Sequence, residues 1–146
     1  MTKNEIVANL KRADADTLYA RADEVREKYL GDEVHIRGIC EFSNFCKNDC
    51  LYCGLRRSNG KITRYRMHPE EIVRLANTMT ASGIKTVVLQ SGDDSGFERK
   101  ELAGIIDRIK KDNPEIALTL SVGERPFDDY KAFKDGRLKL VGNSFK

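Results

Sequence analysis

Three of the four cysteines in this chain lie within eight residues, in the segment NFCKNDCLYC (44–53). Cys46, Cys50 and Cys53 have the spacing C-x-x-x-C-x-x-C, whereas Cys40 lies alone in an apolar run. Thiolates are common protein ligands of zinc and the usual ligands of iron–sulfur clusters. Three thiols cannot all pair into disulfides, and they leave a four-coordinate metal site incomplete. The spacing therefore favours a metal centre that keeps one position free for another ligand.

The spacing alone leaves two kinds of metal site open. A structural zinc site usually has four protein ligands, often in two separated pairs, and this sequence has no second pair of cysteines. His68 lies well beyond Cys53, and Cys40 belongs to a strand-like segment, so neither completes the set. A cluster of four irons held by three thiolates leaves one iron open to a small ligand. We therefore favour an iron–sulfur cluster over zinc, and unconnected thiols least of all.

Composition is that of an ordinary single domain. The chain has 146 residues with 26 basic and 23 acidic side chains, so its net charge is +3 at pH 7. This near balance favours neither nucleic acid nor a membrane surface as a partner. The N-terminal sequence has no apolar signal core, and no run approaches the ~18 apolar residues of a membrane span. We expect a cytoplasmic protein, and in that reducing compartment clustered cysteines usually bind metal or do redox chemistry.

Hydrophobic periodicity predicts strands and helices in alternation. A run with period two, EVHIRGICEF (33–42), predicts the first strand, and TVVLQ (86–90) and IALTLSV (116–122) predict two more. The expected helices cover about residues 3–12, Asp14 or Asp16 to Gly31, Pro69 to Gly83, about Leu102 to Asn113, and Pro126 through Phe133.

Alternation of this kind implies a parallel sheet with helical crossovers. We expect an α/β fold with a helical extension over residues 1–32 and, over residues 33–146, about three to four parallel β-α units. A short alternating segment, LKLV (138–141), is the candidate for the fourth strand. A doubly wound sheet and part of a barrel both agree with this order. A complete eight-unit barrel needs about 250 residues, so this chain can supply only part of one.

Three polar stretches follow the three expected strands. The cysteine segment follows the first, SGDD (91–94) the second and GER (123–125) the third. Parallel strands end at one edge of the sheet, and ligands bind there. We therefore expect the three stretches to converge in space. Taken alone, SGDD is also typical of an ordinary turn, because Ser, Gly and Asp are common turn residues.

The cysteine segment, with Tyr52 before its last cysteine and a strand directly before it, resembles the radical S-adenosylmethionine (SAM) superfamily. The surrounding sequence is similar to the HydE family of iron–iron hydrogenase maturases. The similar segments are RGICEFSNFCKNDCLYCGLRRSN, PEEI, VLQSGDD and LTLSVGE. Biotin synthase and the enzyme that makes methylornithine are relatives of that family. The resemblance extends from about residue 18 to about residue 136. It implies a partial TIM-type barrel, truncated to roughly the N-terminal half of such an enzyme.

The resemblance also implies the cofactors and the residues that hold them. Cys46, Cys50 and Cys53 would bind a 4Fe–4S cluster, and the amino and carboxylate groups of SAM would bind its open iron. One electron from the reduced cluster would then cleave SAM and release a 5′-deoxyadenosyl radical, so the cofactors carry the chemistry. The alternative is a non-catalytic remnant that binds an iron–sulfur cluster or zinc.

Five further residues are implied as SAM contacts: Tyr52, Ser91, Gly92, Asp93 and Thr119. Tyr52 would pack near the adenine, or else anchor the loop from beneath. SGDD occupies the place of the family's GGE strand end, so Asp93 is one methylene shorter than the usual glutamate. The family's threonine at the position of Thr119 faces the cavity. Without the family, Thr119 and Ser121 on one strand face would more often be a pair satisfied internally.

The implied partners are those of a maturation enzyme. They are a small-molecule substrate in the full-length form, an electron donor such as a ferredoxin or flavodoxin, and other hydrogenase maturases, with no nucleic acid and no membrane. A basic stretch between Gly54 and Met67 is interpreted as a solvated loop, with a docking surface for such a partner as the alternative. Its basic residues are Arg56, Arg57, Lys61, Arg64 and Arg66.

Overall fold

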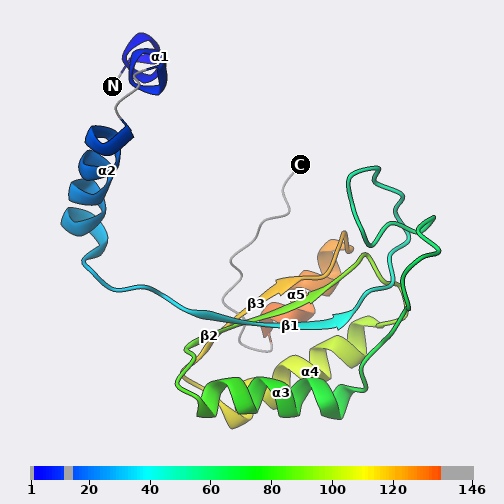
Figure 1. Ribbon diagram of the computed structural model, residues 1–146. Coiled ribbons are helices and arrows are strands. Elements are labelled where there is room, and N and C mark those ends of the chain that lie inside the picture. The colour runs from blue at the N-terminus through cyan, green and yellow to red at the C-terminus, as the bar shows by residue number, and fades with distance from the viewer. Residues whose placement is uncertain (1, 12–14, 136–146) are drawn as a thin grey trace. The chain divides into compact units, whose positions relative to one another are not determined.

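The computed structural model describes residues 2–11 and 15–135. Contacts divide the chain into two units, Met1–His35 and Ile36–Lys146. The first unit contains helices α1 (Lys3–Lys11) and α2 (Ala15–Leu30), as the periodicity predicts (Figure 1). Gly31 follows α2 with a φ of 69°, a left-handed conformation that commonly ends helices and that glycine adopts at little cost. The assignment of domains to residues 1–32 and 33–146 stays a prediction.

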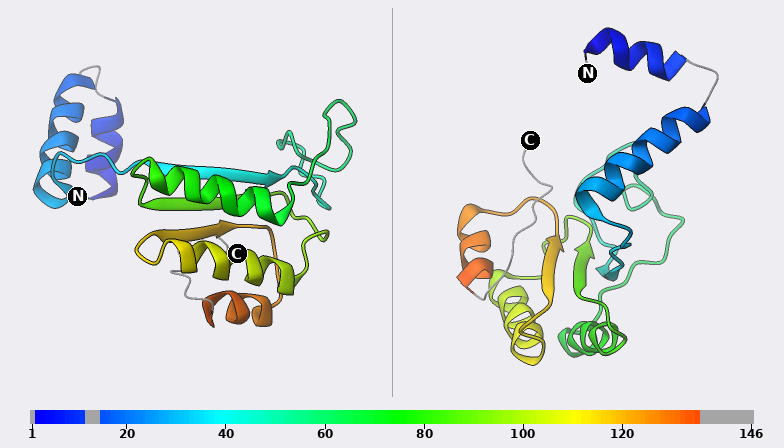
Figure 2. Two further views of the ribbon diagram at one scale, coloured as in Figure 1. Left: turned by 90° about the horizontal axis from the view of Figure 1, so that it is seen from below. Right: turned by 90° about the vertical axis from the view of Figure 1, so that its left-hand side faces the viewer.

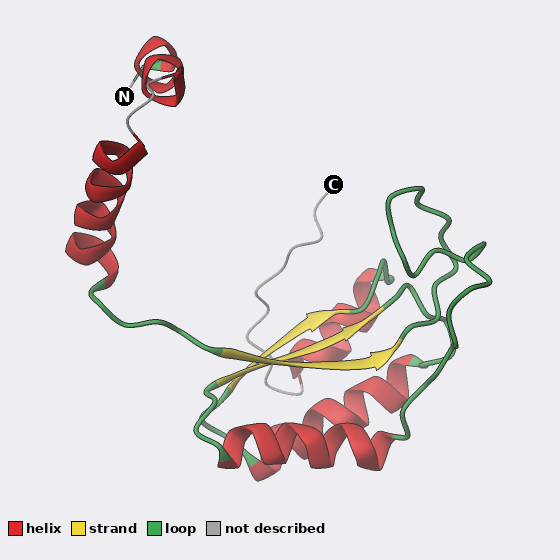
Figure 3. Cartoon of the chain, viewed as in Figure 1, coloured by secondary structure: helices red, strands yellow, loops and turns green. Residues whose placement is uncertain are grey.

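The second unit is built on one parallel sheet. Its strands lie in the order β1-β2-β3, so each strand neighbours the next one along the chain (Figure 3). Arg37 on β1 pairs with Thr86 on β2, which pairs with Ala117 on β3. The strands span Arg37–Ser43 (β1), Thr86–Ser91 (β2) and Ala117–Ser121 (β3).

A helix follows each strand, which confirms the predicted α/β order. Helices α3 and α4 lie side by side along the sheet, and α5 packs beside α4 (Figure 2). Pro69 is the first residue of α3, where its missing N–H is no loss, because the first N–H groups of a helix have no partner within it. The helices span Pro69–Ala81 (α3), Arg99–Asp112 (α4) and Phe127–Asp135 (α5).

The core lies between the sheet and these helices. Alternate side chains of each strand point to opposite faces, and the helix-facing set is buried, including Cys40 on β1, Leu89 on β2 and Leu118 on β3. Helix α4 contributes four buried apolar side chains at helical spacing, namely Leu102, Ile105, Ile106 and Ile109. The other sheet face carries Ile39, which is 53% exposed. The sheet is therefore packed on one side only within the described residues.

The first strand is shorter than its alternating pattern predicts. It begins at Arg37 rather than near Glu33, and Val34 and Ile36 are 86% and 71% exposed. The reason lies in the pairing, because β2 begins at Thr86 opposite Arg37 and offers no backbone partner to earlier residues. The candidate fourth strand at 138–141 lies outside the described residues. No described helix is both long and apolar enough to span a membrane.

Candidate metal centre and cofactor site

The cysteine loop, residues 44–59, leaves the end of β1 and extends beyond the carboxyl ends of the strands (Figure 3). It is folded on itself by short-range hydrogen bonds. The Cys53 N–H donates to the Cys50 carbonyl at 3.0 Å, and the Ser58 N–H donates to the Asp49 carboxylate at 3.0 Å. Cys50 is exposed, and Cys46 and Cys53 are half-buried. All three thiols therefore lie on a compact loop at the edge of the sheet where ligands bind.

The three polar stretches after the strands converge, as predicted. The Lys47 N–H donates to the Asp93 carbonyl at 2.9 Å, and the Asp93 N–H donates to Cys46 Sγ at 3.4 Å. The Glu124 N–H donates to the Asp93 carboxylate at 3.5 Å. Asp93 thus joins the cysteine loop, the end of β2 and the end of β3.

The Asp93 side chain is only 10% exposed, and groups of the cysteine loop occupy its carboxylate. Lys47 Nζ lies 3.1 Å from one oxygen, and Asn48 Nδ2 donates to the other at 3.0 Å. The sequence predicts Asp93 as a cofactor contact. In this structure its visible role is to fix the two residues that follow Cys46.

Two glycines permit this close packing. A Cβ atom at Gly92 would lie 2.2 Å from the Phe45 carbonyl oxygen and 2.9 Å from Cys46 Cβ. Gly123 has a φ of 76°, and a Cβ there would lie 2.6 Å from the Asp93 carboxyl carbon. Since both contacts are shorter than real Cβ atoms make, any larger residue would push the cysteine loop or the β3 end away from Asp93.

An ion pair between the exposed Arg66 and the buried Asp94 also supports the loop. Arg66 makes two hydrogen bonds to the Asp94 carboxylate, at 2.7 and 2.8 Å, and its guanidinium stacks 3.9 Å from the Phe45 ring centre. The Ser43 hydroxyl and the Gly96 N–H also donate to Asp94, at 2.6 and 2.8 Å. Burial raises the pKa of Asp94, but these hydrogen bonds outweigh it and lower the pKa below its ordinary value.

The basic stretch is only in part the solvated loop that the sequence predicts. Arg66 is paired with Asp94, and the half-buried Arg64 donates to backbone carbonyls of the cysteine loop. Arg64 is therefore not a solvated cation, whereas Arg66 is exposed as predicted but is also paired. Arg57 and Lys61 are exposed, as predicted.

The other predicted SAM contacts, Tyr52, Thr119 and Ser91, differ in exposure and in hydrogen bonding. Tyr52 is 93% exposed, so the interpretation as an anchor beneath the loop is wrong. Thr119 pairs with Val88 on the sheet face opposite the helices. Neither the Thr119 nor the Ser121 hydroxyl has a hydrogen bond within the described residues, so the expected internal pair is absent there. Ser91 Oγ donates to the Gly92 carbonyl at 2.7 Å.

A hollow of about 260 Å³ lies beside Ser91, at the carboxyl ends of β1 and β2. Its lining residues are Glu41, Ser43, Asn44, Leu55, Tyr65, Gln90 and Ser91. A ligand that contacts the strand ends would therefore find space there. A second hollow, of about 330 Å³, also borders the cysteine loop and SGDD, and Lys47, Asp93 and Glu124 are among its lining residues.

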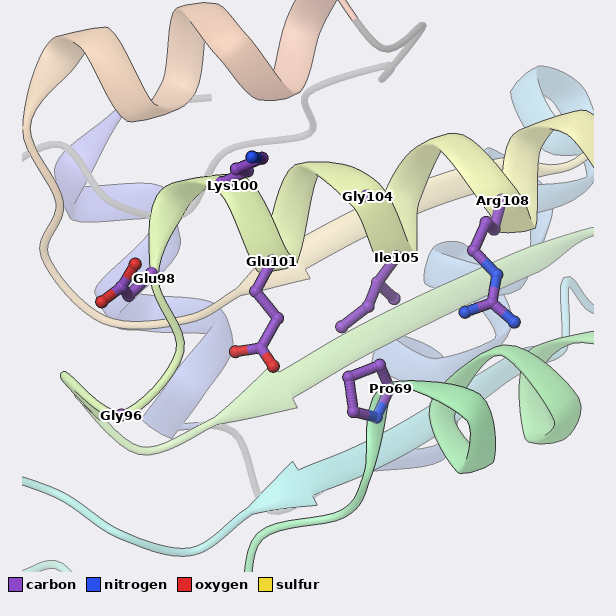
Figure 4. A pocket seen from close by; sticks show the side chains of 8 residues that line it. All are labelled: Pro69, Gly96, Glu98, Lys100, Glu101, Gly104, Ile105 and Arg108. Atoms are coloured by element: carbon purple, nitrogen blue, oxygen red, sulfur yellow. The ribbon is translucent and has the colours of Figure 1, made fainter.

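A larger hollow of about 590 Å³ lies on the outside, between the start of α3 and helix α4 (Figure 4). Pro69 and Ile105 point toward each other there, and the charged side chains of Glu101 and Arg108 lie on either side of them (Figure 4). It contains none of the predicted site residues, so we do not connect it with the candidate site.

The three clustered cysteines offer thiol donors on one loop. Among the described residues, no three His, Cys, Asp or Glu side chains come together closely enough to hold one metal ion. A four-iron cluster distributes its cysteine ligands over different irons, and three partly accessible thiols on one loop agree with that arrangement.

Sequence reasoning missed the residues that hold the loop in place. Arg64, Arg66 and Asp94 belong to no motif, and the sequence identifies Asp94 only as part of the SGDD stretch. The only available signal was that two arginines follow the cysteines at a spacing of two, which places both on one side of an extended segment.

Comparisons with known proteins agree with this site. The profile of the Radical SAM superfamily matches residues 40–146. The [FeFe] hydrogenase maturase subunit HydE of Thermotoga maritima is 51% identical over 120 residues, which are 82% of this chain and 34% of that protein. Biotin synthase of Desulforudis audaxviator is 31% identical over 142 residues, covering 92% of this chain and 43% of that protein. The chain thus spans about a third of the HydE relative's length.

A solved structure is similar as well. The crystal structure of methylornithine synthase (PylB) superposes with a TM-score of 0.86 at 25% identity, over 95% of this chain and 42% of that one. The three β-α units and this partial match confirm the predicted part of a TIM-type barrel. Because the superfamily profile covers most of the sequence, including all three clustered cysteines, this chain belongs to the radical SAM superfamily.

Proposed function

We propose that this chain forms the cluster-binding part of a radical SAM enzyme of the HydE kind. One observation carries the proposal. The loop with Cys46, Cys50 and Cys53 follows β1 directly and is hydrogen-bonded, through Asp93, to the ends of β2 and β3. Three thiols are thereby held where a parallel sheet binds its ligands. The 51% identity to HydE supports this choice within the superfamily.

The proposed roles follow from what each residue offers. The thiolates of Cys46, Cys50 and Cys53 are the ligands of a 4Fe–4S cluster. The exposed Tyr52 ring is free to pack on the adenine of SAM. Gly92 brings the backbone close to Cys46, Ser91 directly precedes it at the end of β2, and Asp93 orients Lys47 and Asn48.

Thr119 completes the proposed set on the sheet face opposite the helices, where we propose that its hydroxyl contacts a ligand. When bound, the reduced cluster supplies the electron that cleaves SAM to a 5′-deoxyadenosyl radical.

The partners of the whole enzyme belong to the same proposal, because the chain spans only 34% of the HydE relative. We propose a small-molecule substrate, an electron donor such as a ferredoxin or flavodoxin, and contacts with other hydrogenase maturases. A cytoplasmic location agrees with the free cysteines, since such thiols persist in a reducing compartment.

Metal and sulfide analysis after anaerobic reconstitution tests the cluster. We expect about four iron and four sulfide per chain, as a 4Fe–4S cluster requires. One zinc per chain without sulfide would overturn the proposal. A Cys40→Ala chain is the control. It lacks one thiol but keeps Cys46, Cys50 and Cys53, so its iron and sulfide content should equal that of the native chain.

Cleavage of SAM separates an enzyme from a remnant. The loaded chain is incubated anaerobically with SAM and a strong reductant, and 5′-deoxyadenosine is measured. We expect cleavage that is slower than in a full-length relative, since only part of the barrel walls the cofactor from water. A full cluster with no 5′-deoxyadenosine would instead favour the non-catalytic remnant.

A further inference from the structure

The guanidinium of Arg64 is the centre of a cluster of backbone carbonyls. Its Nη1 donates to the carbonyls of Asn44 and Leu55, the latter at 2.9 Å. Its Nη2 donates to the carbonyls of Arg56 and Asn59, at 2.7 and 3.4 Å. The two terminal nitrogens carry four N–H groups, so each of these groups has a carbonyl to meet.

These four carbonyls come from both ends of the cysteine loop. Asn44 precedes the first cysteine of the loop, and Leu55, Arg56 and Asn59 follow the last. The Arg64 side chain therefore ties together the two points between which all three thiols lie. No other described side chain bonds to both ends of this segment.

A second set of bonds holds Arg64 itself. The Asn44 amide donates to the Thr63 carbonyl at 2.7 Å, and the Tyr65 N–H donates to the Asn44 amide oxygen at 2.7 Å. The Asn44 N–H donates to the Tyr65 carbonyl at 3.3 Å. Asn44 thus binds the backbone on both sides of Arg64, while Arg64 binds the Asn44 carbonyl. Each residue fixes the other.

We infer that Arg64, held by Asn44, is a positioning residue that sets the spacing of the three cluster-binding thiols. The inference rests on the proposed function for its meaning, because the thiols matter only if they hold a cluster. A planar fork with several donors can serve four separated carbonyls, whereas a lysine ammonium places its three donors on one nitrogen. Arg64→Lys therefore keeps the charge but loses most of the bonds.

The first test uses the chain without any metal. Amide hydrogen exchange is measured by mass spectrometry in the native chain and in Arg64→Gln, Arg64→Lys and Asn44→Ala. We expect exchange in peptides covering residues 46–59 to accelerate about tenfold or more in all three variants, since the loop opens locally. Peptides from β2 and α4 should exchange as in the native chain.

Arg57→Gln is the matched control. It makes the same chemical change in the same loop, but the Arg57 side chain is exposed, and among the described residues it has a charge interaction with Asp49 and no hydrogen bond. Native-like exchange of the loop in both Arg64 variants would overturn the inference. So would equal acceleration across β2 and α4 in Arg64→Lys and Asn44→Ala, which would show a general stability role.

The second test measures the cluster after reconstitution. Both Arg64 variants should change the electron paramagnetic resonance line shape of the reduced cluster, because the thiolates no longer keep their native spacing. Arg64→Gln should in addition lower the reduction potential, since it removes a positive charge near the cluster. Spectra and potentials identical to the native ones in both variants would overturn the inference. If the native chain binds no cluster, the proposed function fails, and the exchange test still decides whether Arg64 organises the loop.

Discussion

Cysteine has opposite roles in strand β1 and in the cysteine loop, although the two regions are adjacent in the sequence. Cys40 lies on β1 against the helices, is 2% exposed, and burial raises its pKa to about 11. Cys46, Cys50 and Cys53 lie on the cysteine loop, and each keeps some exposure. A buried thiol behaves as a small apolar residue, and an accessible one is available as a ligand. Position relative to the sheet, rather than residue type, separates the two uses.

The two regions are also held together by different forces. The surroundings of Cys40 are apolar side chains from the sheet and helices. The cysteine loop is held by charged groups instead, through Arg64, Asp93 and the Arg66–Asp94 pair. Hydrogen bonds to charged groups contribute roughly 1.5–3 kcal/mol each. We therefore expect the strand region to respond to changes in volume, and the loop region to changes in charge.

The largest expected difference concerns cluster binding. Cys46→Ala, Cys50→Ala or Cys53→Ala should each abolish the visible absorption and paramagnetic signals of a reconstituted 4Fe–4S cluster, because each removes one of three protein ligands. Cys40→Ala should leave them unchanged. Loss of the cluster in Cys40→Ala, together with its retention in Cys46→Ala, would show that the cluster ligands are assigned to the wrong cysteines.

The next largest difference concerns thiol reactivity in the metal-free chain. At pH 8 the exposed Cys50 should be alkylated by iodoacetamide more than about a hundredfold faster than Cys40. Cys40 is inaccessible and has a raised pKa, so little of it is thiolate. Peptide mass spectrometry over a time course measures both rates. Unfolding the chain in denaturant is the control, since it should bring the two rates together.

A smaller effect is expected from the charged support of the loop. Asp94→Asn should lower the free energy of unfolding by about 2 kcal/mol at pH 7, because Arg66 loses a charged acceptor. The lowered pKa of Asp94 makes its contribution fully present above the unfolded value of about 4, and it is lost as the pH falls through the folded value.

Denaturant unfolding at several pH values measures this contribution. The native chain should lose stability toward acid more steeply than Asp94→Asn. Asp107→Asn, at an exposed position on α4, is the control. Equal acid sensitivity of the native chain and Asp94→Asn would contradict the assignment.

The smallest expected effect is the stability change in Cys40→Ala. Removal of one buried sulfur should cost about 1 kcal/mol at neutral pH, as small core truncations do. The raised pKa of Cys40 means that its contribution is present below the unfolded value of about 8.5 and is lost as the pH rises toward about 11. The difference in free energy of unfolding between the native chain and the variant should therefore become smaller as the pH rises. A difference that stays constant from pH 7 to 10.5 would show that the thiol is less buried than the structure indicates.

Much of this architecture could be predicted from the sequence because it depends on local patterns. The spacing of apolar residues predicts α3, α4 and their boundaries at Pro69 and Asn113 closely. The alternation of strands and helices predicts a parallel sheet, and a parallel sheet brings the segments after its strands to one edge. The convergence of Cys46, Asp93 and Glu124 follows from topology alone, and the structure confirms it.

Other features were decided only by the tertiary structure, because they depend on which distant groups meet. The alternating pattern continues before Arg37, yet β1 begins there because β2 offers no partner earlier. The pairing of Arg66 with Asp94 joins residues 28 positions apart, and no local pattern marks it. Arg64 reads as one more solvated cation until the folded loop brings four carbonyls to it. The residue types in the sequence predict which side chains are the ligands of the candidate site. Contacts between distant residues, which form only in the folded chain, determine what holds those ligands in place.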